Sequence, residues 1–334
     1  MRYLPSRFLI SLAGYSTLVL FLGGLLSVSG GCGKHPKTAD EEAPAVLPPA
    51  ALLVEQQVSG MILGSTLRLP TALVVSDKGT VYLIDSGNRR VIWFDSHLTP
   101  VRDFYGGGGS SGRLSEPAYL TVDSDGTLWI TDHGSRLLTQ CSDRLEYIAE
   151  IEPEDENAPM ELIHPTGIAV TGFGDIWIGD LLNSRIAVLD AAGQVAQYVG
   201  DFGYAGGALN HPGKLLIDDK GKIYVCDTDN RRIVVYDDRG SLINEIKHSA
   251  LENPVAVTLD GYRRLWVLDK FSGRVHCFDR DGAYVASLGP MVSGTDQPLK
   301  HPSDLVFVPD GRLVISDTGN DRLLVCQVLS GVNP

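Results

Sequence analysis

Three histidines stand directly before a proline, each at the same place in a recurring stretch of sequence. They are His164, His211 and His301. Imidazole is a common zinc ligand, so three such side chains at equivalent positions could meet around one ion. The stretches that carry these three histidines are not all consecutive along the chain. We therefore expect these histidines to bind no metal and keep them only as weak candidates.

Three other residues carry polar groups at a second equivalent position, two residues after a proline. They are Tyr119, Lys214 and Asp304. The same position elsewhere holds only small residues, namely Ala72, Gly167 and Ala256. We regard the three polar residues as a candidate site for a small polar ligand. The alternative is that they fill space or form a Lys–Asp contact.

The remaining signatures argue against several kinds of chemistry. The chain has five cysteines and no Cys-x-x-Cys pair, which excludes a zinc ribbon, a dithiol redox centre and c-type haem attachment. Motifs of serine hydrolases and P-loop enzymes are absent as well. We expect no cofactor, and we expect buried free thiols at four positions. These are Cys141, Cys226, Cys277 and Cys326.

The elements that position these residues belong to six copies of one template. Each copy has a proline, an apolar strand, a turn, and a second apolar strand that ends in aspartate; an arginine and a third strand follow. The prolines are Pro70, Pro117, Pro165, Pro212, Pro254 and Pro302, and the aspartates are Asp85, Asp132, Asp180, Asp227, Asp269 and Asp317. Glycine occupies the turn in every copy but one: the fifth copy along the chain has Arg263 there. Because the Asp and Arg recur in every copy, we expect them to pair and to hold the loop between them.

The template resembles the NHL repeat. The third copy, Pro165–Val170 (PTGIAV), and the fourth, Ile223–Ile233 (IYVCDTDNRRI), are close to the repeat's core. The resemblance implies an all-β, six-bladed β-propeller over residues 51–330, but it does not specify function. Peptidyl-amide lyase relatives bind zinc through histidines just after the proline, where this chain has none. Calcium-dependent lactonase relatives need Glu, Asp and Asn side chains that converge on the channel, whereas the position two after each proline holds a carboxylate in one copy only, Asp304.

One strand is missing from the last copy, which ends soon after its third strand. The segment Leu53–Val58 precedes the first copy and has the character of an outer strand. We predict that this N-terminal strand completes the last blade and closes the ring, because an open ring would expose an unpaired strand edge.

The N-terminus has the pattern of a bacterial export signal. Arg2 and Arg7 precede an apolar run, and small residues lead to Cys32. We predict a signal peptide over residues 1–31, lipidation of Cys32, and a disordered tether over residues 32–50. The expected location is the cell envelope, with the outer membrane favoured. Two alternatives remain: cleavage after Ser29, and an uncut apolar anchor.

The charge and the loops bear on the partner. A net charge of −13 disfavours nucleic acid and suits a basic protein. Long loops precede four copies and share one face, which often marks a binding surface; the alternative is tolerated variation of surface loops. They are Gly106–Leu114, Glu152–Ala158, Asp201–Gly207 and Gly289–Asp296. We expect a membrane-anchored, non-catalytic scaffold that binds a protein on this face. The alternative is a propeller hydrolase or lyase, or a small-ligand sensor, that uses the central channel.

Overall fold

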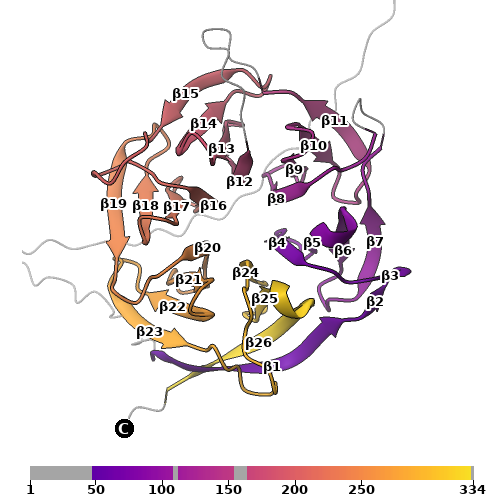
Figure 1. Ribbon diagram of the computed structural model, residues 1–334, viewed down its shortest axis with the longest axis vertical. Helices are drawn as coiled ribbons and strands as arrows, with labels where there is room; N and C mark the ends of the chain where they lie inside the picture. Colours follow the sequence, from indigo (N-terminus) through magenta and orange to yellow (C-terminus); the bar gives the residue numbers. More distant parts are fainter. Residues whose placement is uncertain (1–46, 108–111, 154–163, 332–334) are drawn as a thin grey trace, which may run out of the picture. The chain divides into compact units, whose positions relative to one another are not determined.

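Six four-stranded antiparallel sheets surround a central axis (Figure 1). The computed structural model describes residues 47–107, 112–153 and 164–331. The six-bladed β-propeller is therefore confirmed. The predicted signal peptide, Cys32 and most of the predicted tether lie outside the described residues. Within the described residues, no helix is long and apolar enough to cross a membrane.

Blades 1 to 5 each use four successive strands, with the innermost strand first. The strands of blade 1 are β4 (Pro70–Val75), β5 (Val81–Asp85), β6 (Arg90–Phe94) and β7 (Pro100–Phe104); of blade 2, β8 (Pro117–Val122), β9 (Leu128–Asp132), β10 (Leu138–Cys141) and β11 (Tyr147–Ile151); of blade 3, β12 (Pro165–Val170), β13 (Ile176–Asp180), β14 (Arg185–Leu189) and β15 (Val195–Val199). Those of blade 4 are β16 (Pro212–Ile217), β17 (Ile223–Asp227), β18 (Arg232–Tyr236) and β19 (Leu242–Lys247), and those of blade 5 are β20 (Pro254–Leu259), β21 (Leu265–Asp269), β22 (Arg274–Phe278) and β23 (Tyr284–Leu288). A short hairpin, β2 (Met61–Ile62) and β3 (Ser65–Thr66), lies on the rim beside β7.

Blade 6 combines the two ends of the described chain. It contains β24 (Asp304–Phe307), β25 (Leu313–Asp317) and β26 (Arg322–Ser330), and its outer strand is β1 (Pro49–Ser59). The β1–β26 pairing runs from Pro49 opposite Ser330 to Ser59 opposite Arg322. The predicted closure of the ring by an N-terminal strand is confirmed. The strand begins before the predicted segment because β26 continues to Ser330 and pairs with β1 as far as Pro49.

The buried hydrophobic side chains form six clusters, and each cluster lies between two neighbouring blades. Trp266 and Leu268 of blade 5, for example, pack against Leu305 and Ile315 of blade 6. Corresponding clusters fill the other five interfaces. A blade therefore buries its two faces only by stacking against its neighbours, as in other repeat architectures. The four cysteines outside the tether are buried free thiols, as predicted.

The strand-ending aspartates hold the loops. In five blades the carboxylate accepts the backbone N–H of the residue two before the inner-strand proline, as Asp227 does from Asn210 at 2.6 Å. The predicted Asp–Arg pair forms in four blades, through Arg90, Arg185, Arg232 and Arg322. In blade 5, Arg274 instead donates to Ser287 Oγ. These repeated groups are structural.

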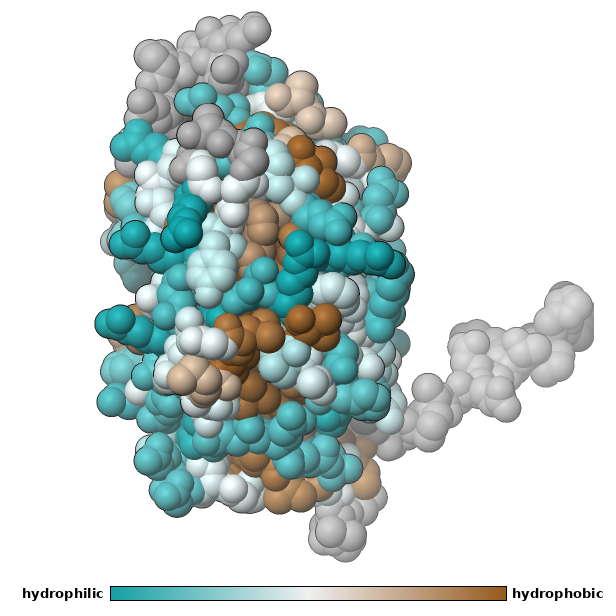
Figure 2. Space-filling view, turned by 90° about the vertical axis from the view of Figure 1, so that its right-hand side faces the viewer, coloured by the Kyte–Doolittle hydropathy of each residue, from teal (hydrophilic) through white to brown (hydrophobic). Residues whose placement is uncertain are grey.

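The rim of the propeller has a mixed surface. Figure 2 shows small hydrophobic areas among hydrophilic ones on the side of blades 1 and 2. The exposed apolar side chains of the elements on this side include Met61, Val101 and Ile148. Such scattered apolar residues are normal on a folded protein and do not mark a site.

Candidate functional site

The inner strands bring two of the predicted ligand residues together. Lys214 on β16 and Asp304 on β24 meet across the channel, with 2.5 Å between Lys214 Nζ and Asp304 Oδ1. Blade 5 lies between these two blades and has only Ala256 at the equivalent position, which leaves room for the long lysine side chain. The channel is therefore bridged by an ion pair.

The bridge is well satisfied by hydrogen bonds. Lys214 Nζ also donates to the Leu305 carbonyl at 3.2 Å. Asp304 accepts the backbone N–H of Leu73 and of Leu305, each at 2.7 Å. Only 1% of Asp304 and 9% of Lys214 is exposed. Burial raises the pKa of the Asp304 carboxyl, while Lys214 and the two backbone N–H groups act in the opposite direction.

Tyr119, the third predicted residue, lies where two cavities of the channel meet. It lines a cavity of about 440 Å³ at the end of the channel nearest the long loops. It also lines a cavity of about 220 Å³ farther along the axis, together with Lys214. Burial, and secondarily the nearby Asp304 carboxylate, raises the pKa of the Tyr119 phenol, so the phenol stays protonated at neutral pH.

The cavity nearest the long loops, called here the mouth cavity, contains polar groups without partners. Thr71 Oγ1 and His133 Nε2 are buried and, within the described residues, have no hydrogen-bond partner. Glu116 and Lys270 line the same cavity. Buried polar atoms are normally paired, so these two atoms are available to a small polar ligand or to ordered water.

His133 is a side chain at the mouth cavity that could take part in proton transfer. Burial, and next the neighbouring His164, lower its pKa from the ordinary value of 6.5, so it is a neutral base at pH 7. The two imidazole rings are 5.2 Å apart, edge to face. A neutral base without an activated nucleophile or a bound metal does not make a catalytic set.

Apart from Tyr119, the sequence reasoning did not single out the polar residues of the mouth cavity. Three of its lining residues, Ser86, His133 and Lys270, follow the strand-ending aspartate directly, a position that was not compared between copies. That position holds Ser86, His133, Leu181, Thr228, Lys270 and Thr318. Because the first residues of the inner strand pair with the end of the second strand, these side chains lie at the mouth of the channel. A comparison at this position would have revealed His133 and Lys270.

The three metal candidates lie on the long-loop face and make separate contacts. The ring of His164 packs against His133, and His211 Nδ1 contacts the Asp229 carboxylate. His301 is exposed. In the ranges that the structure describes, no three His, Cys, Asp or Glu side chains are grouped so that they could hold a metal ion.

The long-loop face also exposes large apolar side chains. Phe202 and Tyr204 belong to the loop before blade 4, and their rings are 6.3 Å apart. Tyr204 is 74% exposed and Phe271, after the second strand of blade 5, is 69% exposed. Leu182 and Met291 are exposed on the same face. Parts of two predicted long loops, residues 108–111 and 154–158, lie outside the described part of the chain, as do residues 159–163.

Comparison with known proteins extends the fold assignment. No protein-family model and no curated protein matches the sequence. A streptogramin B lyase structure is similar with a TM-score of 0.60 and 16% identity, over 82% of this chain and 98% of that one. A gluconolactonase from Xanthomonas campestris gives 0.62 and 17%, over 86% and 98%. Virginiamycin B lyase from Staphylococcus aureus gives 0.57 and 17%, over 78% and 81%. At these identities the similarity establishes a shared propeller fold.

Proposed function

We propose that this propeller, of the NHL-repeat type, is a lipid-anchored binding protein of the bacterial envelope that docks a basic protein on its long-loop face. The observation that carries the proposal is the group of exposed apolar side chains there, Leu182, Phe202, Tyr204, Phe271 and Met291. Aromatic residues and methionine are enriched where proteins bind one another. The acidic net charge of −13 favours a basic partner.

The channel chemistry supports binding over catalysis. Lys214 and Asp304 neutralise each other inside the channel; Asp304 is buried, and Lys214 borders only the cavity of about 220 Å³. The structurally similar lyases and lactonase are enzymes, but a shared fold does not carry an activity with it. We therefore assign the long-loop face to recognition.

Site-specific photo-cross-linking tests this assignment. A photoreactive phenylalanine analogue replaces Phe202 or Phe271 in the full chain, expressed in its own bacterial envelope. The matched control is Phe173, which is 88% exposed on the opposite face, in the turn between β12 and β13. Adducts with a basic protein are expected from positions 202 and 271, and fewer of them at high salt. Equal adducts from position 173, or none from the two loop positions, would refute docking on this face.

A second candidate function is the sensing of a small polar ligand in the mouth cavity. The unpartnered Thr71 Oγ1 and His133 Nε2 favour it. A bound ligand raises the melting temperature of the folded state by mass action. A screen of sugars and peptides should therefore give a rise that His133→Phe abolishes. A rise that survives this substitution would place the ligand elsewhere.

A further inference from the structure

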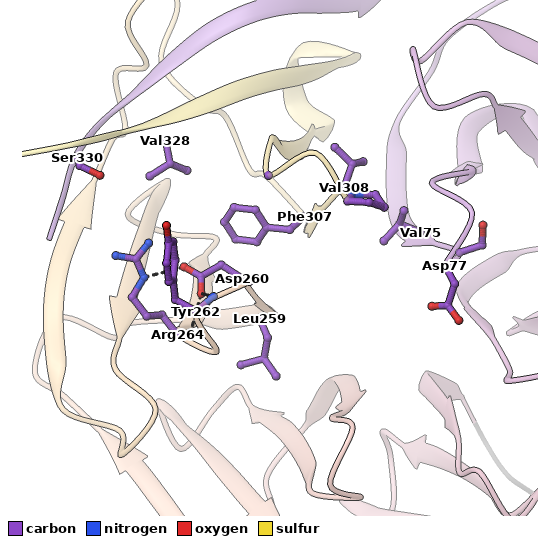
Figure 3. Close-up of a pocket in the computed structure, with 14 residues that line it drawn as sticks. Val75, Asp77, Leu259, Asp260, Tyr262, Arg264, Phe307, Val308, Val328 and Ser330 are labelled. Atoms are coloured by element: carbon purple, nitrogen blue, oxygen red, sulfur yellow. Dashed lines mark hydrogen bonds and ion pairs between the residues drawn. The ribbon is translucent and has the colours of Figure 1, made fainter. Parts of the chain in front are cut away.

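A cavity of about 760 Å³ lies on the face opposite the long loops, where the turns that follow the inner strands of blades 5, 6 and 1 meet (Figure 3). Its size is typical of pockets for small organic molecules. Of the residues that line it, only Val75 also lines the channel cavity of about 220 Å³ that Tyr119 and Lys214 border. It is therefore a site apart from the channel and from the long-loop face. We call it the turn-face pocket.

Blade 6 departs from the repeat at this pocket. In the other five blades, the turn after the inner strand begins with a side-chain oxygen that accepts the backbone N–H four residues on. The five residues are Ser76, Asp123, Thr171, Asp218 and Asp260. Blade 6 has Val308 there, followed by Pro309. An apolar pair thus replaces a polar turn at the pocket wall.

Blade 5 departs from the repeat at the same pocket. Its turn has Arg263 in place of glycine, with a positive φ of 62°. The Arg263 guanidinium donates to Asp218 of blade 4 at 2.8 Å and also contacts Asp219. The turn of blade 5 is therefore tied to blade 4, on the side away from blade 6. The blade 6 departure lies in the cavity wall. Arg263 does not line the cavity itself, but its neighbours Tyr262 and Arg264 do. A cavity beside departures from the repeat is where a function specific to this chain is expected.

The pocket walls are apolar and aromatic. Tyr262 stands at one end of the cavity and is 64% exposed, while Val75 lies at the other end (Figure 3). Phe307 lies between them, with its ring 5.4 Å from that of the buried Trp266. Val328 adds a further apolar wall. These surfaces suit a flat apolar group, which would bury area against Tyr262 and Phe307.

Among the described residues that line the pocket, one carboxylate has no side-chain partner. Arg264 is neutralised by Asp260, with 2.7 Å between Nε and Oδ2, and it also donates to the Leu47 carbonyl. Asp260 further accepts the Trp266 indole N–H at 2.9 Å. Asp77, at the end opposite Tyr262, is exposed and has no side-chain partner among the described residues (Figure 3). A ligand therefore meets an apolar wall, an aromatic ring and a free negative charge.

We propose that the turn-face pocket binds a small organic amine, with a flat apolar body against Tyr262 and Phe307 and a protonated nitrogen toward Asp77. A cation near a free carboxylate gains Coulomb energy. The Tyr262 ring is assigned to the apolar body and not to the cation, because the Arg264 guanidinium already lies 5.3 Å from the centroid of that ring. A carboxylate ligand of equal shape would be repelled by Asp77.

The test uses two probes with matched bodies and opposite charges, phenethylamine and 3-phenylpropionate. Binding to the full chain in neutral-lipid nanodiscs is measured by isothermal titration calorimetry, with empty nanodiscs subtracted. One site for phenethylamine is expected, and the affinity for 3-phenylpropionate should be at least tenfold weaker. Asp77→Asn should remove most of this preference, since it removes only the charge.

The matched aromatic variants locate the site. Tyr262→Ala should weaken phenethylamine binding at least fivefold, whereas Phe173→Ala, at the equivalent turn position of blade 3, should leave it unchanged. Both side chains are exposed, so both variants should keep the parental melting temperature. The proposal is overturned if phenethylamine shows no saturable binding, if both probes bind equally well, or if Tyr262→Ala has no effect. None of these outcomes bears on docking at the long-loop face.

Discussion

Removal of the strand that closes the ring should destabilise the whole propeller. A chain that lacks residues 1–59 loses β1 and leaves the edge of β26 unpaired, whereas a chain that lacks residues 1–46 keeps the strand. Leu52 on β1 is only 3% exposed and packs in the cluster with Leu324 and Cys326, which are both fully buried. Truncation of a buried leucine to alanine alone typically costs about 2–5 kcal/mol. Loss of the entire strand also removes its pairing and exposes the two buried neighbours, so we expect more than about 5 kcal/mol, or aggregation.

Point variants calibrate this expectation. Leu52→Ala should lower the melting temperature by several degrees, at roughly 2–4 °C for each kcal/mol in a chain of this class. Glu55→Ala, on the same strand but exposed, should change it by less than about 2 °C. Differential scanning calorimetry of the two truncations and the two variants provides the comparison. Equal melting temperatures for the two truncations would show that β1 does not hold the ring together, and the reasoning would fail.

Three further predictions concern the channel, the pH response and the anchor. Lys214→Met should lower the free energy of unfolding by about 3–5 kcal/mol in chemical denaturation, because Asp304 would be buried without its partner. Asp304→Asn in the same chain should restore much of this loss. A single variant as stable as the parent would contradict a structural ion pair. Burial lowers the pKa of His276 from its ordinary value of 6.5, and neither of its ring nitrogens has a hydrogen-bond partner within the described residues. The unfolded chain therefore binds this proton more readily, so stability should fall as pH drops below 6.5. His276→Leu should reduce this fall, measured as the difference between melting temperatures at pH 7.5 and 5.5. An identical pH response in the variant would exclude His276 as the cause. Cys32→Ala should abolish labelling by palmitate and release the protein from membranes, whereas retention with an uncut leader would support the apolar anchor instead.

The fold could be predicted because one spacing repeats six times. In blades 1 to 5 the proline and the aspartate are opposite each other in the pairing of the first two strands, as Pro70 and Asp85 are. A constant separation between them fixes the register of every blade, so no tertiary information is needed. The closing strand followed from a count, since the last copy had one strand too few and Leu53–Val58 had no blade of its own.

The site was harder to predict because it depends on which side chains meet across the axis. Lys214 and Asp304 are 90 positions apart, and whether they pair depends on the width of the channel and on the small Ala256 between them. Pairing was one of the two alternatives that the sequence left open. The turn-face pocket had a visible sign, Arg263 in place of glycine, but the cavity itself arises only where three turns converge. A departure from the repeat can be read from the sequence, whereas the space beside it cannot.

The closure of blade 6 also imposes an order on folding during synthesis. Gln57 on β1 contacts Arg322 on β26 across 265 positions, so the earliest strand of the propeller to leave the ribosome must await the last one. Blades 1 to 5 contain only consecutive strands and can form as they emerge, but the ring stays open until translation is complete. Contacts of such long range slow folding, because loop-closure entropy must be overcome before they form. A product of premature termination therefore carries β1 without its partner, which distinguishes it from a finished chain.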